Sequence, residues 1–391
     1  MERAPDPGRD PRGAEPSRVP GSRQTSTAER PTARFDSPAR PGAAEQPITR
    51  TDVPAGPGTA GQAGAGGPAT PAAAPRGPRR WWQQVSSVLG WLAVAVALLG
   101  IALHYGISQR FSAVLLASFA PYLMLGAVLA LLFFAVARRY RSGALALAVL
   151  AGAFWTQLPL FVADGHAGNG PPLTVLQSNL LFGGADADAV RAVVRDERVD
   201  VLTAQELTLE AVARLDAAGL AEDLPYRYLQ AGTGGGGSGI YSRYPIRDER
   251  RFDGFEMANL GVTVDHPELG PIQVLNFHPM PPPLNFGAWA GEMARTEQIL
   301  AASTGPVVVG ADFNATRDHT AFRALLGGRF ADAAELAGAG PQLTFPADRA
   351  WGPLIGIDHV LLAGGTAESV RTLTVPRSDH RAVLARIRLD D

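Results

Sequence analysis

Three uncharged apolar stretches follow one another in the amino-terminal half of the chain and constrain its fold more than any other feature. They cover residues 85–103, 111–137 and 144–163, and none contains Asp, Glu, Lys or Arg. Each is close to the ~20 residues that a helix needs to cross a bilayer. A buried helical hairpin in a soluble protein is the alternative, but three such stretches in succession exceed what a core normally uses. We therefore predict three transmembrane helices within residues 81–165.

Arginines around these stretches set the predicted topology. Arg79 and Arg80 precede the first stretch, and three arginines fill the turn between the second and the third, whereas the loop between the first two offers only Arg110. Cytoplasmic loops carry the excess of basic residues, so we expect the amino-terminal tail and the second turn in the cytoplasm. Three crossings then place the carboxy-terminal domain outside. The prediction is a multi-pass plasma-membrane protein with an extracytoplasmic domain.

The tail over residues 1–80 is dominated by Pro, Gly, Ala, Ser, Thr and Arg, with almost no large apolar side chain to bury. Such a segment cannot offset the entropy cost of ordering, so we predict a disordered cytoplasmic tail. The whole chain lacks cysteine and lysine. This excludes disulfides, thiolate metal sites and a phosphate-binding Walker lysine, so the Gly-rich segment 233–238 is not a P-loop.

From residue 170 to residue 391 the pattern changes to short β-branched strands and amphipathic helices. We predict strands at residues 173–178, 199–204, 239–242, 259–264, 272–277, 307–311, 357–362 and 381–389. We predict helices at residues 186–196, 208–218, 287–302 and 319–326. Many strands without strict β-α-β alternation favour an α/β fold with a two-sheet core and helices outside.

Polar side chains stand where several of these strands end. Glu206 follows the second strand, His278 follows the fifth, and Asp312 and Asn314 follow the sixth. Carboxylates and amides can hold a divalent cation and position water, while imidazoles donate to phosphate oxygens. The plainer alternatives are a helix-start acid at Glu206 and an Asx-turn at Asp312. Together the residues point to metal-dependent hydrolysis of a phosphate ester.

Asp358 and His380 form the second predicted pair. A carboxylate beside an imidazole fixes its tautomer or keeps it protonated, so the ring can donate to a phosphate oxygen. Asp379, adjacent to His380, is free to face a metal or the attacking water. His359, next to Asp358, could simply face away from the site.

In their order along the chain, these motifs resemble those of the endonuclease/exonuclease/phosphatase superfamily, the DNase-I-like metal-dependent phosphoesterases. The resemblance spans residues 173–391 and rests on Asn179, Gln205-Glu206, Gly239 to Ile246, Asn276 to His278, Gly310 to Asn314, Ile357 to His359 and Ser378 to His380. It implies a four-layer α/β/β/α sandwich and Mg²⁺ or Mn²⁺ as the cofactor.

The resemblance also implies roles for single residues. Glu206 would be the principal metal ligand, assisted by Asn179, with Asp379 near the metal. Asp312 would position or deprotonate the water, and Asn314 would stabilise the phosphoryl oxygens. His380, oriented by Asp358, would act on the phosphate, with His278 as a second donor.

The proline run after His278, Pro279-Met280-Pro281-Pro282-Pro283, departs from the usual pattern and fixes a stiff loop at the rim of the site. Together with the triple-span anchor it resembles the membrane-bound VanJ-like proteins of actinomycetes, associated with resistance to teicoplanin-type glycopeptides. This implies a phosphoesterase acting on a lipid-linked phosphate or pyrophosphate of the cell envelope.

Two other functions remain open. One is a surface nuclease or nucleotide phosphatase with the same residues. Residues 170–391 carry 19 Arg against 28 acidic residues, and this acidic excess disfavours nucleic acid as the substrate. The other is a non-catalytic envelope binding or scaffold protein, although such a protein has no physical need for the full set of polar positions.

Overall fold

The computed structural model describes residues 78–166 and 168–390. The predicted tail over residues 1–80 lies outside the described residues, apart from residues 78–80, which already belong to the first helix. The part that precedes the sheets is helical. Its elements are α1 (Pro78–His104), α2 (Phe111–Ala117), α3 (Ala120–Met124), α4 (Gly126–Val136), α5 (Tyr140–Gln157) and the 3-10 turn η1 (Leu158–Phe161).

The second apolar stretch is not one straight helix. Its chain bends by 70° between α2 and the helical run that follows from Ala120 to Val136. Pro121 lies in the first turn of α3, where its ring and its missing N–H prevent the preceding helix from continuing. The prediction of a single helix over residues 111–137 is therefore corrected to a broken one.

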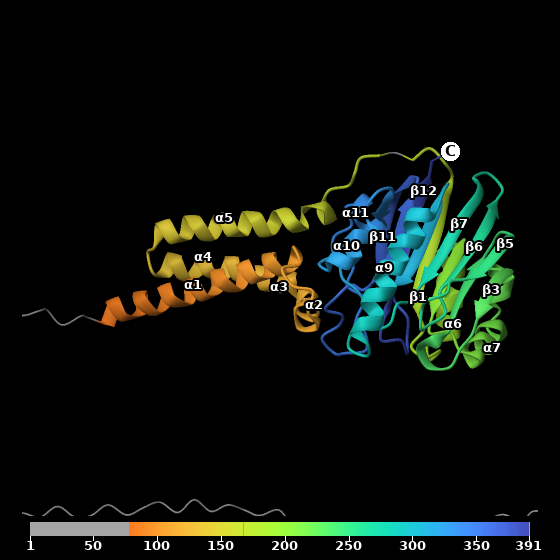
Figure 1. The fold of residues 1–391 in the computed structure, drawn as a ribbon, viewed down its shortest axis with the longest axis horizontal. Coiled ribbons are helices and arrows are strands. Elements are labelled where there is room, and N and C mark those ends of the chain that lie inside the picture. The colour runs from red at the N-terminus through yellow and green to blue at the C-terminus, as the bar shows by residue number, and fades with distance from the viewer. Residues whose placement is uncertain (1–77, 167, 391) are drawn as a thin grey trace, which may run out of the picture. The chain divides into compact units, whose positions relative to one another are not determined.

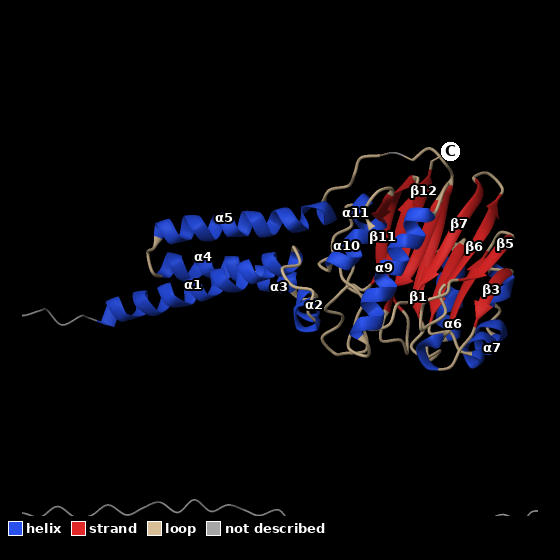
Figure 2. Cartoon of the chain, in the orientation of Figure 1, coloured by secondary structure: helices blue, strands red, loops and turns tan. Residues whose placement is uncertain are grey.

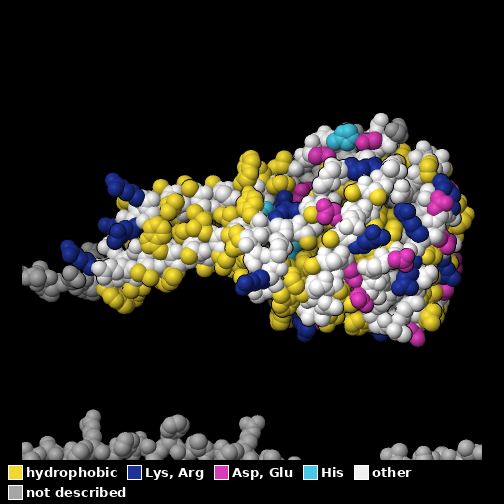
Figure 3. Space-filling model, viewed as in Figure 1, with side chains coloured by type: hydrophobic (Ala, Val, Ile, Leu, Met, Phe, Trp, Pro, Cys, Tyr) yellow, Lys and Arg dark blue, Asp and Glu magenta, His cyan; other side chains and the backbone are white. Residues whose placement is uncertain are grey.

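Two helices, Arg80–His104 and Tyr140–Phe161, are long and apolar enough to cross a membrane, and the bent pair passes the same test if it is taken as one span. Glycines let these helices pack closely. A Cβ at Gly126 of α4 would lie 2.6 Å from the carbonyl oxygen of Ala93 in α1. Small residues at helix contacts are typical of membrane bundles. In Figure 3, hydrophobic side chains cover much of the visible surface of these helices.

Residues 172–389 build two six-stranded sheets (Figures 1 and 2). The strand order is β11-β12-β1-β2-β4-β3 in one sheet and β5-β6-β7-β8-β10-β9 in the other. The strands of the first sheet are β1 (Pro172–Asn179), β2 (Val201–Gln205), β3 (Tyr226–Gln230), β4 (Ser238–Ser242), β11 (Gly365–Thr374) and β12 (Arg381–Leu389). Those of the second are β5 (Ile246–Arg251), β6 (Leu260–His266), β7 (Gly270–Phe277), β8 (Val307–Asp312), β9 (Phe330–Asp332) and β10 (Asp358–Ala363).

The apolar core has three parts that follow the layers. Alternate residues of both sheets, such as Val175 and Val308, meet between the sheets. The outer face of the first sheet packs against α6 (Ala187–Asp196), α7 (Leu209–Ala217) and α8 (Leu220–Asp223). The outer face of the second packs against α9 (Phe286–Ala302) and α10 (Thr320–Leu325), while α11 (Ala333–Leu336) lies against β10 and β11. The prediction of a two-sheet core with helices outside is confirmed.

All eight predicted strands form, with ends displaced by at most two residues, and the four unpredicted strands are the four sheet edges: β3, β5, β9 and β11. The edge strand β5 has the sequence IRDERR and is almost entirely exposed. Edge strands bury only part of their side chains and often carry charges, so the apolar signal that marks central strands is missing from them.

The helical part contacts the domain through the segment 316–323, which follows β8, and through the loop that carries Leu354. His104 Nδ1 lies 2.7 Å from Asp318 Oδ1, and both side chains are buried. His319 Nε2 lies 2.8 Å from the carbonyl oxygen of Val114 in α2. Tyr122 of α3 donates a hydrogen bond of 2.6 Å to the carbonyl oxygen of Leu354. The helices are thus bonded to a segment that begins four residues after Asp312.

Candidate active site

The topology brings the carboxyl ends of four strands to one edge of the core. β1 runs parallel to β2, and β7 runs parallel to β8, so each pair ends at the same edge. Asn179 ends β1, Glu206 follows β2, His278 follows β7 and Asp312 ends β8. The two sheets meet at this edge, because Asn179 Nδ2 donates a hydrogen bond of 3.0 Å to Asp312 Oδ2.

Antiparallel neighbours deliver the remaining groups to the same edge. β10 is antiparallel to β8, with Asp358 directly opposite Asp312. β12 is antiparallel to β1, and His380 immediately precedes it. The first residue of an antiparallel strand lies beside the last residue of its neighbour. Polar groups that are up to two hundred positions apart in sequence therefore converge.

Gly310 allows the two sheets to approach each other beneath this edge. A Cβ at Gly310 would lie 2.1 Å from Thr203 Oγ1 and 3.1 Å from Thr203 Cβ on the facing sheet. Real Cβ atoms do not approach so closely, so only glycine fits between β8 and β2 without displacement.

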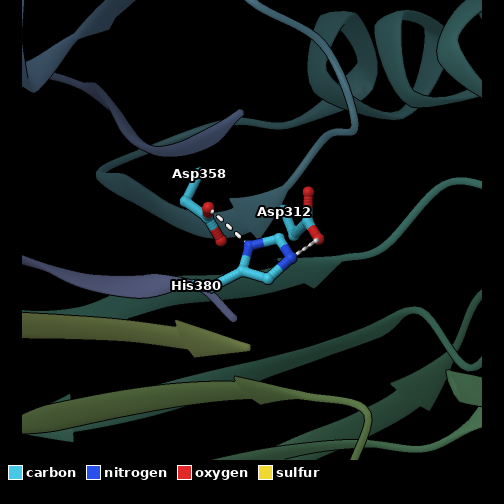
Figure 4. A group of neighbouring side chains, drawn as sticks. All are labelled: Asp312, Asp358 and His380. Atoms are coloured by element: carbon cyan, nitrogen blue, oxygen red, sulfur yellow. Dashed lines mark hydrogen bonds and ion pairs between the residues drawn. The ribbon is translucent and has the colours of Figure 1, made fainter. Parts of the chain in front are cut away.

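His380 lies between two carboxylates, as Figure 4 shows. Its Nδ1 is 2.8 Å from Asp358 Oδ2, and its Nε2 is 3.9 Å from Asp312 Oδ2. Burial opposes a charge on the ring, but the carboxylates of Asp358 and Asp312 outweigh it and raise the pKa of His380 to about 10. Burial likewise disfavours the charge of Asp358, yet the adjacent imidazolium lowers the pKa of that carboxyl. At neutral pH the pair is an imidazolium and a carboxylate.

Asp312 receives its contacts on two sides. Oδ1 accepts a hydrogen bond of 2.9 Å from the backbone N–H of Asn314, the Asx-turn considered above. Oδ2 faces the site, 3.6 Å from His278 Nε2. Burial, followed by the charge of Asp358, raises the pKa of Asp312, while the two histidines oppose this rise. A carboxylate with a raised pKa is a better proton acceptor than an exposed one.

Glu206 reaches the site from a strained turn. Its φ of 55° is in the left-handed region, which non-glycine residues rarely adopt outside functional turns. Its carboxylate accepts hydrogen bonds from Asn179 Nδ2 at 3.1 Å and from the N–H of Phe182 at 2.6 Å. The helix α7 begins only after its N-cap Thr208, so Glu206 does not serve as a helix-start acid.

Asp379 lies beside this group with one oxygen free. Its Oδ1 is buried without a hydrogen-bond partner and lies 3.9 Å from His380 Nε2. Burial raises the pKa of Asp379, and the negative charge of Glu206 raises it further, against the opposing charge of His380. An unpartnered carboxylate oxygen near a second carboxylate is an environment that a cation relieves.

These donors fit a hard divalent cation. Carboxylate oxygens are the ligands that Mg²⁺ and Mn²⁺ prefer, and Glu206 and Asp379 offer them. Asp312, Asp358 and His380 also have ligand atoms within 4.8 Å of one another. An imidazolium cannot bind a cation through a protonated nitrogen, however, so we place the better-fitting position beside Glu206 and Asp379.

Two predicted ligands or donors adopt other orientations. Asn179 Oδ1 accepts from the N–H of Leu181, so its NH₂ group, rather than its oxygen, faces the carboxylates of the site. Asn314 Nδ2 donates to the carbonyl oxygen of Pro279 at 3.1 Å, which joins it to the proline run. His278 is buried beside Asp312, and its backbone N–H is held by Asn259 Oδ1 at 2.7 Å.

His359 points away from the site. Its Nδ1 lies 2.8 Å from Asp332 Oδ2, and its Nε2 lies 3.1 Å from the carbonyl oxygen of Ala315. Successive side chains of a strand face opposite sides, which puts His359 opposite its neighbour Asp358. The expectation that His359 could face away is confirmed.

A chain of buried amides beneath the site was not predicted. Gln177 Nε2 donates to Asp358 Oδ1 at 2.9 Å and to Gln205 Oε1 at 2.8 Å. Gln205 Nε2 donates to Asn276 Oδ1 at 2.8 Å, across to the other sheet. Each of these side chains is fully buried within an apolar strand. The sequence feature that could have indicated this network is a single amide in an otherwise apolar strand, because a buried polar group requires hydrogen-bond partners.

Comparison with known proteins identifies related folds. Residues 176–380, just over half of the chain, match the Endonuclease/Exonuclease/phosphatase family. A humanised TDP2 of D. rerio is 14% identical, with a TM-score of 0.47, over 56% of this chain and 99% of that one. An endonuclease/exonuclease/phosphatase family protein of Bacteroides thetaiotaomicron is 17% identical, with a TM-score of 0.47, over 57% of this chain and 99% of that one. The mannosyl-6-phosphatase of that species is 17% identical, with a TM-score of 0.45, over 55% of this chain and 99% of that one. No curated protein matches the chain.

Proposed function

The chain belongs to the endonuclease/exonuclease/phosphatase family, and from this premise we propose that it is a membrane-anchored phosphoesterase dependent on Mg²⁺ or Mn²⁺. Its substrate is a lipid-linked phosphate or pyrophosphate of the cell envelope. The observation that carries the proposal is the ring of His380 between the carboxylates of Asp358 and Asp312, at an edge shared with Glu206 and Asp379.

The chemistry follows from the positions of these groups. His380 donates to a phosphoryl oxygen through Nε2, because Asp358 holds Nδ1 and keeps the ring charged. Asp312 orients the attacking water and accepts its proton, and the N–H of Asn314 holds the carboxylate in place. A cation bound by Glu206 and Asp379 supplies charge neutralisation at the phosphate.

The helices support a lipid substrate. An enzyme anchored beside a substrate that diffuses in the same bilayer meets it at a high effective concentration. The arginines at residues 79–80 and 138–141 favour a cytoplasmic amino terminus and an extracytoplasmic domain. We further propose that the chain belongs to the membrane-anchored VanJ-like branch and contributes to glycopeptide resistance, because the anchor and the proline run after His278 occur together.

The test uses the full chain in lipid nanodiscs with a polyprenyl pyrophosphate, a nucleotide and a single-stranded DNA oligonucleotide as alternative substrates. We expect Mg²⁺-dependent release of phosphate from the lipid. Asp312→Asn should lower kcat about 10²-fold or more, because it removes the proton acceptor. Asp196→Asn is the control, because this exposed aspartate ends α6, just before the start of β2, at the edge opposite the site.

Equal turnover with and without a chelator would exclude the metal. Faster cleavage of DNA or nucleotide than of lipid would replace this proposal by the nuclease or nucleotide phosphatase alternative. Absence of turnover on every substrate would favour the scaffold protein.

A further inference from the structure

An apolar pocket of about 280 Å³ lies where the helical part contacts the domain. Tyr122, Leu125 and Leu160 line it from the helices, and Leu343 and Ile355 line it from the domain. The pocket is separate from the edge that carries Asp312 and His380.

The polar side chains around the pocket are engaged elsewhere. The four charged or imidazole side chains of the lining are paired: His359 and Asp332 with each other, Asp318 with His104, and Arg317 with Glu335. Within residues 78–166 and 168–390, no buried side-chain nitrogen or oxygen of the lining lacks a hydrogen-bond partner. A polar ligand would therefore lose its hydrogen bonds to water without gaining new ones, whereas a hydrocarbon gains free energy by leaving water.

One thin wall separates this pocket from the active site. The segment 341–356 turns Leu343 and Ile355 towards the pocket. Between them in sequence, Thr344 Oγ1 accepts a hydrogen bond of 3.1 Å from the N–H of Ile357, next to Asp358. The ring of Phe345 lies 4.9 Å from the ring of His380. The two faces of one segment thus border an apolar pocket and the catalytic histidine.

The pocket also has apolar surroundings outside. Of the lining residues, Leu125 is 57% exposed and Leu354 is 37% exposed. Leu125 lies between α3 and α4, in the bent pair that is apolar enough to cross a membrane. An exposed apolar residue of a segment with membrane-like hydropathy therefore lines the pocket.

We propose that this pocket holds the hydrocarbon part of a lipid phosphate whose phosphate group lies at Asp312 and His380, with the chain passing around the segment 341–356 that separates the two; this inference rests on the proposed function. The pocket selects substrates by their apolar chain. The segment 341–356 lies between that chain and the reacting phosphate. Each methylene that the pocket takes out of water raises kcat/KM by roughly fourfold, so the pocket determines chain-length preference.

The experiment measures kcat/KM of the full chain in nanodiscs for hexyl phosphate and hexadecyl phosphate. Leu343→Trp fills the pocket, and Leu354→Glu places a charge at its lining. Matched controls are Leu147→Trp on the outer face of α5, and Leu209→Glu on α7; both side chains are exposed and outside the lining. We expect each pocket variant to lose about tenfold or more on hexadecyl phosphate and to keep its rate on hexyl phosphate.

The outcomes separate this inference from the function on which it rests. If wild-type protein does not hydrolyse hexadecyl phosphate, the lipid phosphoesterase proposal itself fails. If it does, and both pocket variants retain its chain-length preference, the pocket assignment is wrong. A parallel loss on both substrates would also overturn it, because the variants would then act by disturbing the wall beside His380.

Discussion

Two histidines on different sheets, His359 of β10 and His380 before β12, show how the neighbourhood of a residue decides its chemistry. His380 and His359 each contact an aspartate at 2.8 Å. His359 uses its second nitrogen on a backbone carbonyl, which leaves it no donor for a substrate. The Nε2 of His380 instead faces Asp312 and Asp379 at 3.9 Å, a separation long enough to admit another group. Only His380 can carry a positive charge and also offer a free N–H donor, at Nε2, to a substrate.

Asp358 is therefore a positioning residue for His380. In Asp358→Asn the ring loses the charge that raises its pKa, so kcat should fall about 10²-fold to 10⁴-fold at neutral pH. The alkaline limb of the pH profile should move to lower pH, which a structural role alone would not cause. The kcat of the His380→Gln variant should fall by a similar factor. His266→Gln, at another buried histidine remote from the site, should leave kcat unchanged.

At the scale of elements, the site depends on how closely β8 and β2 approach. Asp312 belongs to one sheet and Asn179 to the other, and their 3.0 Å hydrogen bond requires both strand ends to be in place. Gly310 sits two residues before Asp312 and faces Thr203 at a separation that only a hydrogen can fill. The spacing between the sheets is thus set by one residue without a side chain.

Gly310→Ala should separate the two strands. Overpacking of this kind costs about 1–3 kcal/mol of unfolding free energy, and the displaced Asp312 should also lower kcat. Thermal unfolding and turnover measured together test both effects. The double variant with Thr203→Ala removes the hydroxyl and methyl groups that the new Cβ meets, and should recover most of the loss. No recovery would mean that backbone strain, rather than this contact, limits position 310.

At the scale of the molecule, the helices are part of the folded unit. His319 lies at their contact with the domain, where Nδ1 accepts from the N–H of Thr316 and Nε2 donates to Val114. Both bonds require a neutral ring with the proton on Nε2. Burial lowers the pKa of His319, against the backbone hydrogen bonds and the charge of Asp318, while Arg323 lowers it further.

This contact should therefore weaken in acid. The unfolded chain protonates His319 at its ordinary pKa of 6.5, and the folded chain protonates it only at lower pH. Unfolding free energy is then retained above pH 6.5 and falls below it, by at most about 1.4 kcal/mol per pH unit. Unfolding of the detergent-solubilised full chain against pH measures the slope. His319→Gln should flatten it. The exposed His166→Gln, whose pKa is shifted upward, should leave the acid slope unchanged.

The sequence alone determined the central strands, since the runs around Val175, Val308 and Leu361 are apolar enough to require burial on both faces. It also identified the polar groups at their ends. It did not predict β5 or the break at Pro121, because exposed and locally bent segments carry weak periodic signals.

Tertiary structure decided which of those polar groups act together. Strand register sets the predicted contact of His380 Nδ1 with Asp358 at 2.8 Å and turns His359, the sequence neighbour of Asp358, to Asp332. The amide chain from Gln177 to Asn276 and the junction pocket exist only because distant segments meet. Local propensity acts over a few residues, whereas a site and a pocket depend on sheet register and on the packing of one element against another.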